Sequence, residues 1–187
     1  MPAEGPSTCA LCGACVVQFI LLAMTMLILA FALLEPVRVT VSDASLSRFA
    51  LNGTALAYDL SLAVSVRNPN WAMRAEHAAP LDADIRFAGR SLAGARLADA
   101  GRSVEAEKTE ELRLRAAGEK VLDSDGVAEL VKQTSAGQLE SLELKIAGKI
   151  RYRPVHVGRY RLAVTCPLRL PATSTNVIVQ DKEIKCH

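Results

Sequence analysis

The sequence predicts a mainly β protein: an antiparallel β-sandwich with one short helix, preceded by a single N-terminal transmembrane helix. Three observations predict this. Apolar and polar residues alternate over several long stretches, one stretch of 20 residues is almost wholly apolar, and only one later segment has helical periodicity. We divide the chain into a cysteine-containing tail (1–13), the membrane helix (14–34) and the β domain (35–187).

The apolar stretch runs from Cys15 to Leu34, and only Gln18 and Thr25 are polar in it. At about 1.5 Å per residue, a helix of this length crosses the roughly 30 Å hydrocarbon layer. Glu35-Pro36 ends it, because a carboxylate is costly in lipid and proline lacks an N–H. Apolarity on all faces over this length favours a membrane span over a buried core helix. A cleaved signal peptide, with Ala30-Phe31-Ala32 at its cleavage site, remains the alternative, but no basic residue precedes the stretch.

The orientation of the domain is open at this point. Arg38 and Arg48 follow the helix and no Lys or Arg precedes it, which by the positive-inside rule favours a cytosolic domain. Two features favour the opposite side. Asn52 begins an Asn-Gly-Thr glycosylation sequon, and the domain's only cysteines, Cys166 and Cys186, suit a disulfide in an oxidising compartment.

Three further cysteines, Cys9, Cys12 and Cys15, lie at the membrane edge. Thiols in this position are candidates for S-acylation, or they stay unmodified. A zinc site would need a fourth ligand, and the nearest histidine is His77. We expect neither a metal nor a cofactor.

Period-two alternation is clearest from Leu56 to Val66, and it ends at the turn Asn68-Pro69-Asn70. A helix is expected at 124–134, with Ser124 or Asp123 as its N-cap. Further strands are expected at 37–41, 81–87, 112–114, 142–152, 160–166 and 177–179. About seven strands joined by turns are typical of an antiparallel sandwich.

The sequence contains no P-loop, GxGxxG, HExxH or GxSxG motif. Asp123-Ser-Asp-Gly begins like a calcium loop but lacks the later oxygen ligands. His77, His156 and His187 are scattered, so a hydrolase would need a deep polar pocket around His77 or His156. The formal net charge of +2 gives no reason to expect a nucleic-acid partner. We therefore expect no catalytic residues and no enzyme activity.

Positive charge gathers on two neighbouring predicted strands. It either protects an edge strand from aggregation, which we favour, or contacts an anionic surface such as lipid headgroups or acidic polysaccharide. Trp71, just after the Asn-Pro-Asn turn, is either an exposed anchor or a lid over the core, and we expect a lid. The basic residues are Lys149, Arg151, Arg153, Arg159 and Arg161.

Several of these features together resemble a plant family, the hairpin-induced-like and non-race-specific disease-resistance-like membrane proteins (NHL proteins), which carry a late-embryogenesis-abundant group 2 (LEA-2) domain. The resemblance rests on the span after a cysteine-containing tail, the strand ending Val66-Arg-Asn-Pro-Asn70, the strand Arg161–Leu168 and the terminal Lys185-Cys-His187.

This resemblance implies an immunoglobulin- or fibronectin-III-like sandwich, anchored in the plasma membrane with the domain outside the cell. It implies a non-enzymatic role in defence and stress responses, through a protein, cell-wall or lipid partner. The alternative function is a cytosol-facing lipid-binding or membrane-tethering module.

Overall fold

The computed structural model describes residues 8–32, 34–154, 157–171, 178–180 and 183–187. The chain separates into two compact units, Met1–Glu35 and Pro36–His187. The first unit contains the helix α1, Thr8–Ala32. Over the described ranges, no helix combines the length and the apolar character that a membrane crossing requires.

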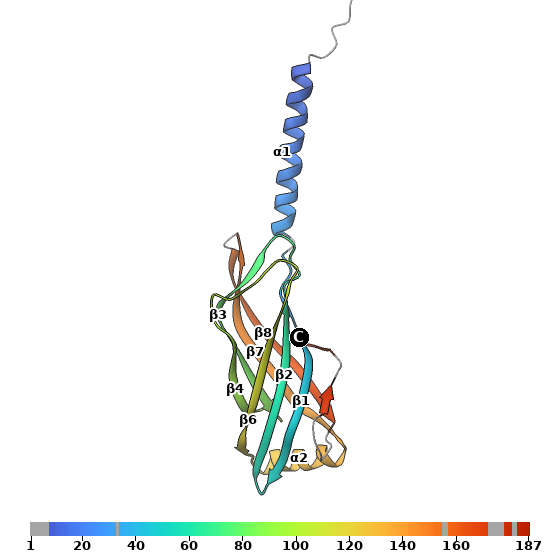
Figure 1. Cartoon of the computed structure of the whole chain (residues 1–187), viewed down its shortest axis with the longest axis vertical. Helices are drawn as coiled ribbons and strands as arrows, with labels where there is room; N and C mark the ends of the chain where they lie inside the picture. The colour runs from blue at the N-terminus through green and yellow to red at the C-terminus, as the bar shows by residue number, and fades with distance from the viewer. Residues whose placement is uncertain (1–7, 33, 155–156, 172–177, 181–182) are drawn as a thin grey trace, which may run out of the picture. The chain divides into compact units, whose positions relative to one another are not determined.

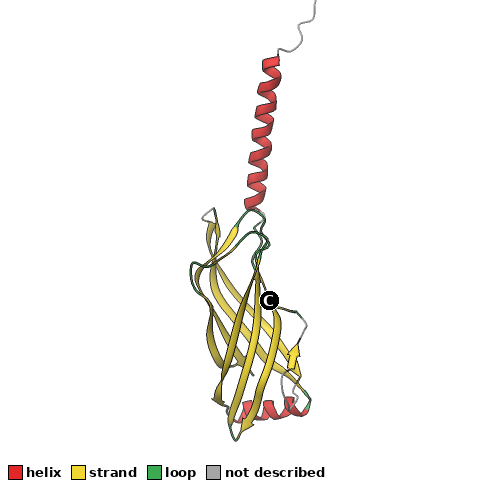
Figure 2. Cartoon of the chain, in the orientation of Figure 1, coloured by secondary structure: helices red, strands yellow, loops and turns green. Residues whose placement is uncertain are grey.

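The second unit is built from two five-stranded sheets in which every pairing between strands is antiparallel (Figures 1 and 2). The first sheet has the order β10 (Ile184–Lys185), β1 (Arg38–Asn52), β2 (Ala55–Arg67) and β6 (Thr109–Val121), and β9 (Ile178–Gln180) also pairs with β1. The second has the order β4 (Arg90–Ala98), β3 (Arg74–Phe87), β7 (Gln138–Arg153) and β8 (Val157–Pro171), and β5 (Ser103–Val104) also pairs with β3.

The inward faces of the two sheets form the core. Along β2, buried residues alternate with more exposed ones from Tyr58 to Arg67, as the period-two pattern predicts. Phe87 and Tyr152 are the aromatic residues among the largest fully buried side chains described, and aliphatic side chains supply most of the others. The aliphatic members include Leu56, Leu62, Leu81, Ile85, Leu139, Leu142, Leu144, Ile146 and Ile150.

The helix α2 (Ser124–Ser135) lies across the end of the sandwich where β1 turns into β2 (Figure 1). Asp123 is its N-cap, and its side chain accepts a hydrogen bond of 3.0 Å from the Gly126 N–H. Gln133 fixes the helix to the start of β7, because its Oε1 accepts from the backbone N–H groups of Glu140 (2.9 Å) and Ser141 (3.1 Å).

The prediction of a mainly β, antiparallel fold is confirmed, and the strands are more numerous than expected. The pattern did not predict β4, in which alanine and glycine dilute the alternation and bulges shift the register against β3. It also marked only parts of β1 and β6. In β1 two register shifts against β2 break the alternation, and the second half of β6 carries mostly alanine, glycine and charged residues. Their length comes from pairing with β2 over its full extent.

Removal of Leu144 tests the aliphatic core. Its side chain is fully buried, and it pairs with Ile85 on one side and Cys166 on the other. We expect Leu144→Ala to lower the free energy of unfolding by about 2–5 kcal/mol, measured by chemical denaturation. Val121→Ala is the control, since Val121 is 72% exposed, and it should change stability by less than about 0.5 kcal/mol. Equal effects of the two substitutions would contradict the assignment of the core.

Candidate functional site

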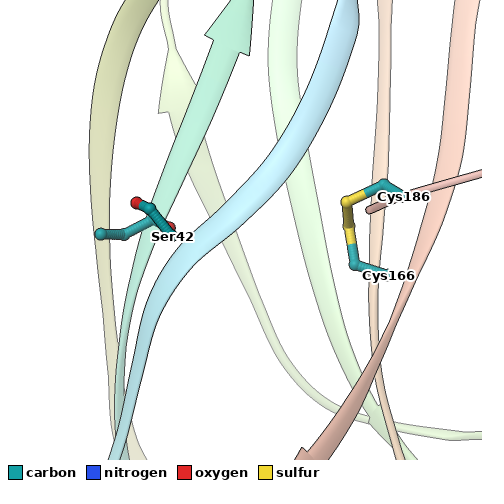
Figure 3. Close-up of a disulfide and its surroundings, with 4 residues drawn as sticks. Ser42, Cys166 and Cys186 are labelled. Atoms are coloured by element: carbon teal, nitrogen blue, oxygen red, sulfur yellow. A yellow bond between two sulfur atoms is a disulfide. The ribbon is translucent and has the colours of Figure 1, made fainter. Parts of the chain in front are cut away.

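The C-terminal residues join the two sheets along one side of the sandwich. Cys186 donates its N–H to the Val39 carbonyl (3.2 Å), while His187 exchanges two backbone hydrogen bonds with Thr165 of β8 (2.7 and 3.0 Å). The sulfurs of Cys166 and Cys186 form a disulfide, with the two Cα atoms 4.2 Å apart (Figure 3). The segment therefore lies between β1 of one sheet and β8 of the other, and it is covalently attached to β8.

The Asn-Pro-Asn turn is a buried hydrogen-bonding centre. The Asn68 side chain is fully buried, and its Nδ2 donates to the carbonyl oxygens of Met73 (2.7 Å), Val104 (3.2 Å) and Glu105 (3.2 Å). Its Oδ1 accepts from the N–H (3.2 Å) and the Nδ2 (2.9 Å) of Asn70. One side chain thus holds two loops together, those of residues 68–73 and 104–108.

Both loops lie at the end of the sandwich where β1 begins. We call this the proximal end and define it by Val37, residues 68–74, residues 104–108 and Arg153-Pro154. The Val37 N–H donates to the Tyr152 hydroxyl (3.1 Å), and Tyr152 pairs with Ala75, which places the start of β1 beside β3 and β7. Trp71 is 61% exposed at this end, so the expectation that it covers the core is wrong.

The predicted basic residues share the outward face of β7 and β8, but they differ in their partners. Arg151 and Arg153 both form ion pairs with Glu76 of β3. Hydrogen bonds from Arg153 and Arg151 hold the pKa of Glu76 below its usual value. Glu76 therefore neutralises part of the positive charge that the basic residues place on this face.

The other three basic residues, Lys149, Arg159 and Arg161, form a surface that we call the positive strip. Lys149 pairs in register with Arg161, and Arg159 lies two residues before Arg161 on the same face. All three are exposed, and none forms an ion pair with any residue that the structure describes. The sheet thus gathers the predicted residues on one surface, with their charge only partly compensated.

A buried polar cluster, which sequence reasoning did not find, lies between β3 and β6. His77 is 1% exposed, and neither of its ring nitrogens has a hydrogen-bond partner among the described residues. Its Nε2 lies 3.7 Å from the Glu110 carboxylate, which forms an ion pair with Arg102 (Nε to Oε1, 2.6 Å). No signal in the sequence joins these residues, since Glu110 is on a strand of the opposite sheet.

The sequon and the membrane-edge cysteines lie elsewhere. Asn52 is exposed at the end of β1, opposite Ala55, and Gly53 makes the turn with a φ of +64°, which glycine adopts without strain. Cys15 is an exposed free thiol on α1. The backbones of Cys9 and Cys12 also belong to α1, but their side chains lie outside the described residues, as does His156.

The described ranges contain no group of His, Cys, Asp or Glu side chains arranged to hold a metal ion. A hollow of about 410 Å³ lies at the proximal end, lined by Ala72, Arg74, Glu105, Ala106, Arg153 and Pro154. Its charged lining consists of Arg74, Glu105 and Arg153.

No family model matches the sequence, and no curated protein matches it either. Among solved structures, the chain is similar to the solution structure of a candidate late embryogenesis abundant (LEA) protein, with 19% identity over 85% of each chain and a TM-score of 0.41. It is also similar to the crystal structure of a protein from Archaeoglobus fulgidus, with 14% identity over 73% of this chain and 98% of that one, and a TM-score of 0.29. Neither likeness establishes a family.

Substitution of Asn68 tests whether the turn is a structural centre. Asn68→Ala removes the donor to the Met73, Val104 and Glu105 carbonyls and the acceptor of two Asn70 hydrogen bonds, and a buried group that loses its partner costs about 1–3 kcal/mol. We expect the variant to lose about 2–4 kcal/mol of stability in chemical denaturation. The matched Asn52→Ala variant, at an exposed turn of unglycosylated protein, should lose less than about 0.5 kcal/mol. Similar values for both would show that the hydrogen bonds of Asn68 contribute little.

His77 predicts a dependence of stability on pH. Burial lowers the pKa of His77 below its ordinary value of 6.5, the Glu110 carboxylate opposes that shift, and the Arg102 guanidinium adds to it. The unfolded chain therefore binds the proton more tightly than the folded one. Stability is fully present above about pH 6.5 and falls as the pH drops toward the lowered folded pKa.

Denaturation of the wild type and of His77→Leu between neutral and mildly acidic pH measures this contribution. The difference in stability between the two proteins should shift in favour of His77→Leu as the pH falls, because leucine takes up no proton. A difference that stays constant across this range would contradict a neutral buried imidazole.

Proposed function

We propose that this chain is a non-enzymatic, membrane-anchored protein of plant defence or stress responses, which acts by interaction of its β-sandwich outside the cell, at the plasma membrane. The observation that supports this most strongly is the disulfide between Cys166 and Cys186. Disulfides persist in oxidising compartments and are rare in the cytosol. The same side of the membrane would expose the Asn52 sequon to glycosylation.

The anchor is supported by the first unit of the chain. The apolar stretch Cys15–Leu34 carries no charged residue, and α1 includes most of it. Leu33, within that stretch, lies outside the described residues. Every described side chain of α1 from Gly13 to Leu29 is exposed, including large apolar ones on all faces, and such a surface needs an apolar surrounding.

The non-enzymatic role and its biological setting rest on other grounds. Two residues on which the resemblance to the NHL family rests have structural roles in this fold. Asn68 joins two loops, and Cys166 holds the C-terminal segment through its disulfide. The family's association with defence and stress supports the same setting here. In this fold the residues of the resemblance act by holding surfaces in place, which suits a binding protein.

One observation favours the second candidate, a cytosol-facing lipid-binding or tethering module. Lys149, Arg159 and Arg161 present uncompensated positive charge, and the cytosolic leaflet is the anionic one. The disulfide argues against it, since the reducing cytosol would keep both thiols free.

The glycosylation state of Asn52 distinguishes the two functions. We expect the full-length protein in plant microsomes to migrate faster after glycosidase treatment, and Asn52→Gln to migrate at that faster position without treatment. Asn176→Gln is the control, since residue 176 lies in no Asn-x-Ser/Thr sequon. This variant should keep the wild-type shift.

Protease protection in the same sealed microsomes supplies the second measurement. A luminal domain is protected until detergent is added, whereas a cytosolic domain is digested at once. Digestion without detergent, together with free thiols at Cys166 and Cys186, would refute the extracellular function and favour the tether. A protein that is extracted from the microsomes by alkaline carbonate would refute the anchor itself.

A further inference from the structure

Trp71 is the single tryptophan of the chain, and the fold holds it out of the core. The residues beside it are fixed: Asn70 donates twice to Asn68, and the Asn70 carbonyl accepts from the Glu107 N–H at 3.1 Å. An indole mounted on a rigid turn loses little conformational entropy when it binds a partner. Tryptophan is also the residue enriched where a membrane meets water, because its ring is apolar and its N–H is polar.

The hollow beside Trp71 contains paired arginines. Arg74 lies directly opposite Arg153 in the register of β3 and β7, and both line it. Arg153 is joined to Glu76, while Arg74 forms no ion pair with any described residue. Glu105 adds one negative charge to the lining, and Glu76 already pairs with Arg153, so Arg74 is the arginine that can bind a phosphate group here.

Other basic side chains surround this position. Lys108 of the proximal end and Arg67, which directly precedes that end in β2, are exposed, and neither forms an ion pair within the described ranges. Glu105 and Glu107 carry two negative charges that balance these two, so the net positive charge near Trp71 comes from Arg74 and from the positive strip. The positive strip of Lys149, Arg159 and Arg161 continues from Arg153 along the outward face of β7 and β8. Positive charge around an exposed indole is complementary to an anionic lipid surface.

The chain itself limits how far this end can lie from a membrane. Glu35 follows the apolar stretch directly, and Arg38, the first residue of β1, pairs with Arg67. Three residues span at most roughly 11 Å even when fully extended. If α1 is a membrane anchor, the proximal end of the β domain is thus tethered within reach of the headgroups, at a very high local concentration of lipid.

We propose that the proximal end is a docking surface for the anionic lipid headgroups of the membrane in which α1 is anchored, with Trp71 in the interface and Arg74 at a lipid phosphate. The proposal rests on the membrane anchor of the proposed function. A lipid phosphate for Arg74 is present in either leaflet, whereas the anionic charge that strengthens docking is greatest in the cytosolic one. Docking at this end leaves the Asn52 turn and α2, at the other end of the sandwich, free for a partner.

The fluorescence of Trp71 tests this directly, because no other tryptophan contributes. The full-length protein is reconstituted into vesicles of phosphatidylcholine, with or without phosphatidylglycerol, that contain lipids brominated near the headgroup. We expect emission at shorter wavelength than in unfolded protein, together with quenching by the brominated lipid that is stronger in the anionic vesicles.

Two matched variants separate the docking site from general charge. Arg74→Gln should lower the ratio of quenched to unquenched Trp71 in anionic vesicles by about five-fold, as expected for one basic side chain near an anionic surface. Arg48→Gln removes an exposed arginine from the distal half of β1 and should leave the ratio unchanged. Equal effects of both variants, or none from either, would overturn the assignment of Arg74.

Flotation of the same samples tests the membrane anchor separately from the docking surface. Protein that floats with the vesicles while Trp71 stays unquenched would overturn the docking surface and leave the anchor intact. Protein that does not float would refute the anchor, and the docking surface with it. Protein that floats, with quenching that depends on anionic lipid and on Arg74, would establish both.

Discussion

The fold depends on the burial of two sheet faces that are filled almost entirely by aliphatic side chains. Aromatic residues make up only 4% of the sequence, and Phe87 and Tyr152 are the ones among its largest fully buried side chains. An aromatic ring buries 150–250 Å², more than a valine or leucine does, so a core without rings needs more residues. The strands supply them through their length, which reaches 16 residues in β7.

Long strands create long edges, and the two sheets are joined differently on their two sides. On one side, the C-terminal segment pairs with β1 and β8, and the Cys166–Cys186 disulfide keeps it there. On the other, the Tyr58 hydroxyl of β2 donates to the Leu92 carbonyl of β4 at 3.1 Å, which links the sheets through a side chain. The C-terminal segment reduces the backbone surface that could pair with another molecule, and the Tyr58 hydrogen bond ties the two sheets together.

The buried polar groups have two different roles. Asn68 satisfies its amide with loop carbonyls and so costs little to bury, which makes it a structural element that positions Trp71. The ring nitrogens of His77 have no hydrogen-bond partner within the part of the chain that the structure describes, and burial of the ring therefore favours its neutral form. Asn68 stabilises the proximal end at all pH values, whereas His77 makes the free energy of unfolding depend on pH.

By itself, the sequence determined the alternation of β2, β7 and β8, the helix after Asp123 and the sharp stop at Asn68-Pro69-Asn70, because these follow from local periodicity, capping and turn chemistry. It also singled out Cys166, Cys186 and the basic residues of β7 and β8 as groups. Only the tertiary structure decided that Arg151 and Arg153 share Glu76, that His77 meets Glu110 and that Trp71 is exposed. Those outcomes depend on register and sheet packing, which bring together residues far apart in the chain, and no local pattern encodes such distances.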